Sequence, residues 1–108
     1  MPSNAEADAS ALDTLIQSAV RQIQEGRLDD ALAELEEILR IDPNLPMAHR
    51  CRGFLYREKA EFEAALESLN ESLRLEPDNA LTYSWRGDTF FRLGIATKRS
   101  PTILRQSG

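Results

Sequence analysis

The chain has 108 residues, of which 42% are apolar and 29% are charged, as expected for one soluble globular domain. Its formal net charge of −5 argues against a nucleic-acid binder, which needs a basic surface. The sequence contains one cysteine, Cys51, and one histidine, His49. We therefore expect no internal disulfide, no metal site, no cofactor and no catalytic centre. No apolar run is long enough to span a membrane.

Charge is distributed unevenly along the chain. Residues 1–45 carry ten acidic and three basic side chains, whereas residues 80–108 carry one acidic and five basic side chains. This asymmetry fits either solvated helix faces followed by a basic tail or head-to-tail self-association. Residues 1–10 contain no Lys or Arg and no apolar stretch, so they lack the features of a secretory signal. We therefore expect a cytoplasmic protein with a disordered N-terminus at residues 1–9.

Apolar residues recur at helical spacing and predict five helices. The first begins at Ser10, where Ser10 and Asp13 have the spacing of a capping box, and Gly26 ends it. The second runs from about Leu28 to residue 41 and is stopped by Pro43, because proline cannot continue a helix.

The remaining three helices have similar signals. Pro46 opens the third helix, which runs to about residue 58, because proline suits the first helical position. The fourth spans about residues 62–75 and is stopped by Pro77. The fifth begins near Asn79, a suitable N-cap, and ends at about Leu93, before Gly94. The connections are short, so consecutive helices should lie antiparallel.

A 34-residue period connects these helices. When the sequence is shifted by 34 residues, the length of two helices, Gly53 aligns with Gly87 and Tyr56 aligns with Phe90. A glycine in the middle of a helix is unfavourable unless another helix passes close to it. Two helices per period cannot close a core, so the repeats must stack into a solenoid. The same 34-residue shift places the second helix on the fourth. It aligns Ala31 with Ala65, Leu32 with Leu66, Leu35 with Leu69, and Pro43 with Pro77.

This spacing resembles the tetratricopeptide repeat family, whose pattern is Trp-x2-Leu-Gly-x2-Tyr in one helix, Ala-x3-Phe in the next, and then Pro. The central repeat of this chain reads His49-x2-Arg52-Gly53-x2-Tyr56, then Ala65-x3-Leu69, then Pro77. The resemblance implies an all-α fold, a right-handed α-solenoid of antiparallel helix pairs with about two and a half repeats. It covers about residues 12–93. We expect a domain at residues 10–94, with repeats at about 12–45 and 46–79 and a partial third at 80–94. Residues 95–108 would form an irregular tail with at most one short helical turn.

The resemblance also implies a function. Family members are non-enzymatic adaptors or scaffolds whose first helices line a concave groove that binds a peptide or helix of another protein. Trp85, Phe91, Arg50 and Arg57 have the chemistry of interface anchors. The predicted groove residues are Ile16, Val20, Arg50, Cys51, Phe54, Arg57, Leu81, Trp85, Asp88, Phe91 and Arg92.

Two alternatives to the adaptor remain open. One is a self-assembling structural protein, a homo-oligomer held by head-to-tail or C-terminal helix contacts. The other is a truncated accessory domain of a larger protein. The outer side of the fifth helix, with Tyr83, Gly87 and Phe90, would be bare unless the tail, through Ile103 and Leu104, or a second copy covers it.

Overall fold

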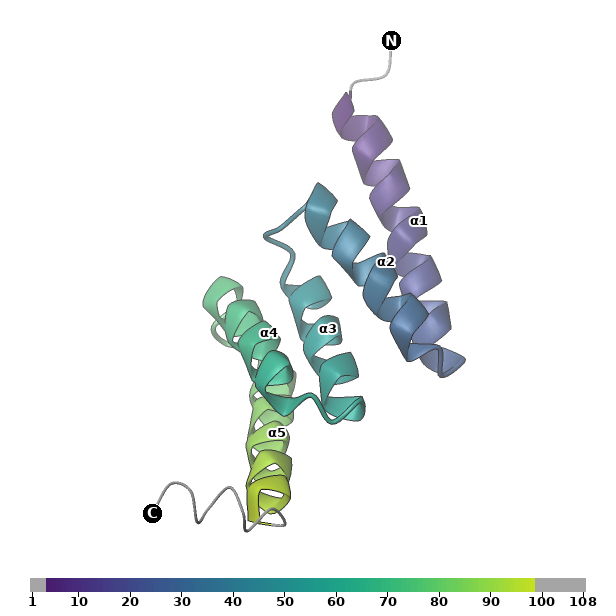
Figure 1. Ribbon diagram of the computed structural model, residues 1–108. Helices are drawn as coiled ribbons and strands as arrows, with labels where there is room; N and C mark the ends of the chain where they lie inside the picture. Colours follow the sequence, from purple (N-terminus) through teal and green to yellow (C-terminus); the bar gives the residue numbers. More distant parts are fainter. Residues whose placement is uncertain (1–3, 99–108) are drawn as a thin grey trace.

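The computed structural model describes residues 4–98, with side chains from residue 11 onward. Over this range the chain forms five helices and no strand (Figure 1), which confirms the all-α prediction. None of these helices is long and apolar enough to cross a membrane. The helices are α1 (Asn4–Gln24), α2 (Leu28–Ile41), α3 (Pro46–Glu58), α4 (Phe62–Leu75) and α5 (Ala80–Lys98).

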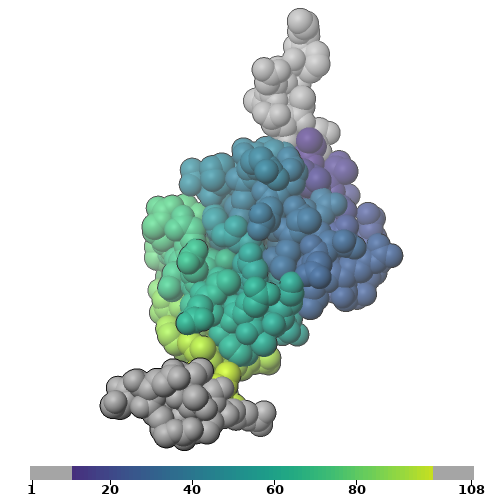
Figure 2. Space-filling view, in the orientation of Figure 1, coloured from purple at the N-terminus to yellow at the C-terminus, as the bar shows by residue number. Residues whose placement is uncertain are grey.

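The helices form an elongated stack in chain order. Helix α2 packs on α1 and α3, and α4 packs on α3 and α5. The molecule measures 64 × 29 × 22 Å, and Figure 1 places the first and last helices at its opposite ends. In the space-filling view the second helices α2 and α4 cover much of the visible face, and the end of α5 emerges beyond α4 (Figure 2). The right-handed sense of the solenoid stays a prediction.

The 34-residue period is visible in the packing of the core. Ala31 and Ala65 are fully buried, as are Leu35 and Leu69 four residues later, at 1% and 0% exposure. Gly53 lies against Ala65 and Leu69 of α4. A Cβ atom on Gly53 would come within 2.7 Å of the Leu69 side chain and 3.2 Å of the Ala65 carbonyl oxygen. The prediction that a helix passes close to Gly53 is therefore confirmed.

The same period appears in a hydrogen bond that ties α3, and likewise α5, to the loop that precedes it. His49 Nε2 lies 2.8 Å from the Pro43 carbonyl oxygen, and the Tyr83 hydroxyl donates to the Pro77 carbonyl oxygen at 2.9 Å. Both residues sit 34 positions apart, as do the two prolines. His49 therefore occupies the position of an aromatic residue and satisfies a loop carbonyl, which is a structural role.

The ends of α2, α3 and α4 lie where the sequence places them, but the start of α1 does not. Helix α1 begins at Asn4 rather than Ser10, so residues 4–9 are helical and not disordered. The segment reads Asn-Ala-Glu-Ala-Asp-Ala. Alanine has the highest helix propensity, and acidic residues near a helix N-terminus interact favourably with its dipole. These preferences outweigh the capping-box signal at Ser10.

The end of α5 also differs from the prediction. Gly26 (φ 77°) and Ala60 (φ 62°) are equivalent positions that adopt the left-handed conformation and turn the chain into α2 and α4. Gly94 is the third member of this series, yet α5 continues through it to Lys98. No second helix follows within the described residues to favour a turn, so the modest propensity cost of glycine is tolerated. The expected tail therefore starts as helix, and Ile103 and Leu104 lie outside the described residues.

The predicted start of α5 is confirmed in atomic detail. Asn79 Oδ1 accepts hydrogen bonds from the Thr82 backbone N–H at 2.9 Å and from the Thr82 hydroxyl at 3.0 Å. Asn79 is therefore an N-cap, and it satisfies one of the free N–H groups of the first turn.

Candidate functional site

The predicted groove residues lie on the first helices, α1, α3 and α5, and the structure joins five of them into one cluster. The rings of Phe54 and Trp85 stack in a tilted arrangement with centroids 5.0 Å apart. The Arg57 guanidinium lies over the Phe54 ring at 5.0 Å and donates to Asp88 at 2.9 Å. Arg92, one turn further along α5, also contacts Asp88 at 2.8 Å. This cluster connects α3 to α5 and forms a continuous surface that we call the first-helix face.

The sequence suggests Arg57 as an interface anchor, but its side chain is largely buried and bound by other residues of the chain. Its side chain is only 11% exposed, and its two terminal nitrogens are bound to Asp88 and Glu58. The remaining nitrogen, Nε, is buried with no hydrogen-bond partner among the described residues. Because these contacts hold the guanidinium in place, Arg57 supports the face by fixing Phe54 and Asp88.

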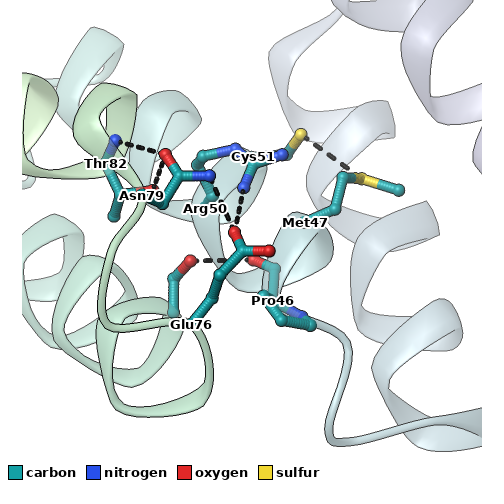
Figure 3. Close-up of polar contacts among 8 residues, drawn as sticks. Pro46, Met47, Arg50, Cys51, Glu76, Asn79 and Thr82 are labelled. Carbon is teal, nitrogen blue, oxygen red and sulfur yellow. Dashed lines mark hydrogen bonds and ion pairs between the residues drawn. The ribbon is translucent and has the colours of Figure 1, made fainter.

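Arg50 is also bound within the chain. Its guanidinium lies 3.5 Å from Glu76 Oε1, and the same oxygen accepts a hydrogen bond from the Asn79 side chain at 2.7 Å (Figure 3). Because Asn79 caps α5, Glu76 links α3 to the start of α5. Sequence reasoning missed Glu76 and Asn79 as members of this surface, since residues 26 positions apart in sequence carry no local signal of contact.

Cys51 and Ile16 are partly buried and pack against the core rather than standing free. The Cys51 thiol lies 3.7 Å from Met47 Sδ (Figure 3). Burial raises the pKa of this thiol above its ordinary value, and the nearby charge of Arg50 opposes that shift only in part. A thiol with a raised pKa is a poor nucleophile, so Cys51 acts as a small apolar residue.

Three predicted groove residues are exposed apolar side chains. Val20 on α1 is 41% exposed, Leu81 is 50% exposed, and Phe91 is 68% exposed. Large apolar side chains grouped on one surface and bordered by charges mark sites of interaction. Among the apolar residues of the predicted groove, these three are the most exposed.

A hollow of about 510 Å³ adjoins Phe91 at the end of this surface. Its lining combines α5 residues with Phe62, the first residue of α4. Ile95, which is 39% exposed, contributes to it because α5 continues past Gly94. Sequence reasoning missed this hollow, since it ended the fifth helix at about residue 93. The lining residues are Phe62, Asp88, Phe91, Arg92, Ile95 and Ala96.

Comparison with protein families agrees with this geometry. The family model described as TPR repeat matches residues 55–94, which include the end of α3, all of α4 and most of α5. Residues 55–94 of this chain carry a TPR repeat. Comparison with curated proteins gave no match. TPR repeats generally serve as protein–protein interaction modules, so the TPR fold of this chain implies protein partners in general.

Within the part of the chain that the structure describes, no three His, Cys, Asp or Glu residues are grouped so that they could hold a metal ion. The ionic contacts of the first-helix face instead pair carboxylates with arginines. Asp88 contacts both Arg57 and Arg92, and Glu76 contacts Arg50. This arrangement provides a rigid apolar surface with charged edges.

Proposed function

We propose that the chain is a non-enzymatic cytoplasmic adaptor whose first-helix face binds a helix or extended peptide of another protein. The observation that carries this proposal is the exposure of Leu81, Phe91 and Ile95 beside the stacked pair of Phe54 and Trp85. Partner recognition then rests on apolar contacts, and the bound arginines hold the surface in shape.

The composition of the face supports a partner with apolar anchors. Interface energy concentrates in a few large side chains at the centre of a contact, surrounded by groups that exclude water. The hollow beside Phe62 can take one apolar side chain of a partner, and Arg92, whose side chain is 46% exposed, offers a polar contact at its edge. Because Arg57 and Phe54 are already held in place, little conformational entropy is lost there on binding.

The proposal is tested with a helical peptide selected from a display library on the folded chain. The Kd of that peptide is measured for the wild type, for Phe91→Ser and for Glu67→Ser. Phe91 is 68% exposed, so its replacement should leave the fold intact. Glu67, an exposed residue of α4, is the matched control. If Phe91 is a central contact, its loss weakens binding by about 2 kcal/mol, while Glu67→Ser has no effect. Equal affinity of both variants for every selected peptide would refute the proposal.

Self-association is a second candidate, favoured by the position of the charges. The acidic helices α1 and α2 and the basic helix α5 lie at opposite ends of the molecule (Figure 1). Opposite charges on the two ends of a molecule favour head-to-tail contact at low salt, where electrostatic screening is weak. Light scattering at about 20 mM and at about 500 mM salt tests this candidate. A mass that stays at one chain at both salt concentrations, over a wide range of protein concentration, would exclude it.

A further inference from the structure

Helix α5 places its apolar side chains in an unusual way. Its fully buried residues are Thr82 and Thr89, both 0% exposed, whereas Tyr83 is 46% exposed and Phe90 is 55% exposed. A surface helix normally shows one apolar stripe toward the core and polar residues elsewhere. Tyr83 and Phe90 do not belong to the first-helix face, so α5 carries a second apolar surface.

This second surface, which we call the outer face of α5, repeats a surface that is covered elsewhere in the chain. It consists of Tyr83, Arg86, Gly87 and Phe90, which the 34-residue period aligns with four residues of α3. In α3 the corresponding surface lies against α4, and Gly53 leaves no room for a Cβ atom beside Leu69. Around Gly87 none of the residues that the structure describes lies within 4 Å of where a Cβ atom would be. The α3 residues are His49, Arg52, Gly53 and Tyr56.

The covered surfaces show what kind of helix fits. In both complete repeats the second helix carries a fully buried alanine and, four residues later, a buried leucine. Between them stands a hydrogen-bond acceptor three residues after the alanine. Glu34 of α2 accepts from the Ser18 hydroxyl at 3.0 Å, and Ser68 of α4 accepts from Arg52 Nε at 3.1 Å.

Arg86 of α5 is equivalent to the donors Ser18 and Arg52. Among the described residues it has no acceptor on a following helix. It reaches back to α4 instead, where it donates to Asn70 Oδ1 at 2.9 Å, and its guanidinium lies 5.3 Å from the centre of the Tyr83 ring. A guanidinium has five N–H donors, so Arg86 retains donors for a further acceptor.

The charge of α5 narrows the choice of occupant. Its one acidic residue, Asp88, is bound by Arg57 and Arg92 of the first-helix face, and its remaining charged residues, Arg86 and Lys98, are both basic. From these observations we infer that the outer face of α5 binds an acidic amphipathic helix of a partner protein. That helix has a small residue whose backbone passes Gly87, an acceptor for Arg86 three residues later, and, one residue after the acceptor, a leucine whose side chain lies against Gly87. The site is separate from the first-helix face and does not depend on its proposed function.

Two other occupants fit less well. In residues 99–108 the 34-residue period places Arg99 at the position of Ala65 and Pro101 two residues later, so this segment lacks the small residue and interrupts a helix. In a second copy, the helices with the required pattern are α2 and α4. Their alanines and leucines are already buried in their own stack.

The test uses a capped synthetic peptide with the sequence of residues 28–41, LDDALAELEEILRI, as an acidic probe with Ala31, Glu34 and Leu35 in the required register. Binding of the labelled peptide to the full chain is measured by fluorescence anisotropy. In the full chain, Gly87→Leu fills the space that the leucine and the backbone of the small residue would occupy in the bound helix. We expect it to weaken binding by about tenfold or more, because overpacking of a helix contact costs that much affinity. The melting temperature of the free chain should not fall, since the described residues leave the space around Gly87 open and leucine has a higher helix propensity than glycine.

Three controls make the result specific. The peptide with Ala31→Leu should bind as weakly as the wild-type peptide binds Gly87→Leu. Trp85→Ala should leave the affinity unchanged, because Trp85 lies on the first-helix face, and raised salt should weaken binding. The inference is overturned by absence of saturable binding or by equal affinity of Gly87→Leu. It is also overturned if the wild-type chain forms a dimer and Gly87→Leu dissociates that dimer. This result would assign the outer face of α5 to a second copy of the chain. Binding seen only after deletion of residues 99–108 assigns it to that segment.

Discussion

Gly53 and Gly87 occupy equivalent positions in α3 and α5, yet replacement by alanine should change stability in opposite directions. Alanine in a helix interior is favoured over glycine by roughly 0.5–1 kcal/mol. At Gly87 a Cβ atom meets no described residue within 4 Å, so Gly87→Ala should gain that full amount. At Gly53 the new methyl group would lie 2.7 Å from Leu69, which is 0% exposed, and 3.2 Å from the Ala65 carbonyl oxygen. Overpacking of this kind costs about 1–3 kcal/mol.

The net loss at Gly53 is therefore centred on about 1 kcal/mol and at most about 2.5 kcal/mol, after the propensity gain is subtracted from the overpacking cost. For a domain of this size, 1 kcal/mol corresponds to roughly 4–8 °C in melting temperature. Urea denaturation and thermal melts followed by circular dichroism should show Gly53→Ala below the wild type and Gly87→Ala above it. If both variants are stabilised alike, the contact between Gly53 and α4 does not have the geometry described.

Other side chains give independent tests. Ser72→Ala should lower the free energy of unfolding by about 1 kcal/mol, measured in urea, because the buried Ser72 hydroxyl donates to the Pro46 carbonyl oxygen at 2.9 Å. Arg57→Ala should lower it by about 1–2 kcal/mol through loss of the Asp88 ion pair and the Phe54 contact, and an unchanged urea midpoint would make Arg57 a free anchor instead. Alkylation of Cys51 by iodoacetamide should be slower in the folded chain than in urea, because burial raises its pKa; equal rates would contradict that position.

The sequence predicts most of this fold because its strongest signals repeat. Ala31 and Ala65 are small where two helices cross, and Pro43 and Pro77 stop both second helices, so each signal is supported by its counterpart. The start of α1 and the end of α5 lack this support from a second repeat, and both were predicted wrongly. At Gly94 a local turn signal is present, but the conformation depends on whether a second helix packs back, which the glycine itself does not determine.

The candidate site was predicted less completely than the fold. Helical spacing correctly places Phe54, Trp85 and Phe91 on first helices, but it does not indicate which of them are covered. The pairing of Arg57 with Asp88, 31 residues away, depends on how α3 and α5 are offset along the stack. That offset is a tertiary property, and it changes Arg57 from a candidate contact into a support for the surface.

Trp85 is the single tryptophan of the chain and lies on the first-helix face, so its fluorescence reports on that face alone. The most direct measurement is therefore a fluorescence titration of the wild type with a peptide selected from a display library, beside the same titration of Phe91→Ser. Binding at the first-helix face should change the emission of Trp85 in a saturable manner, with a clearly higher Kd for Phe91→Ser. Binding detected by calorimetry with no change in Trp85 emission, and with equal affinity for Phe91→Ser, would place partner recognition elsewhere on the molecule.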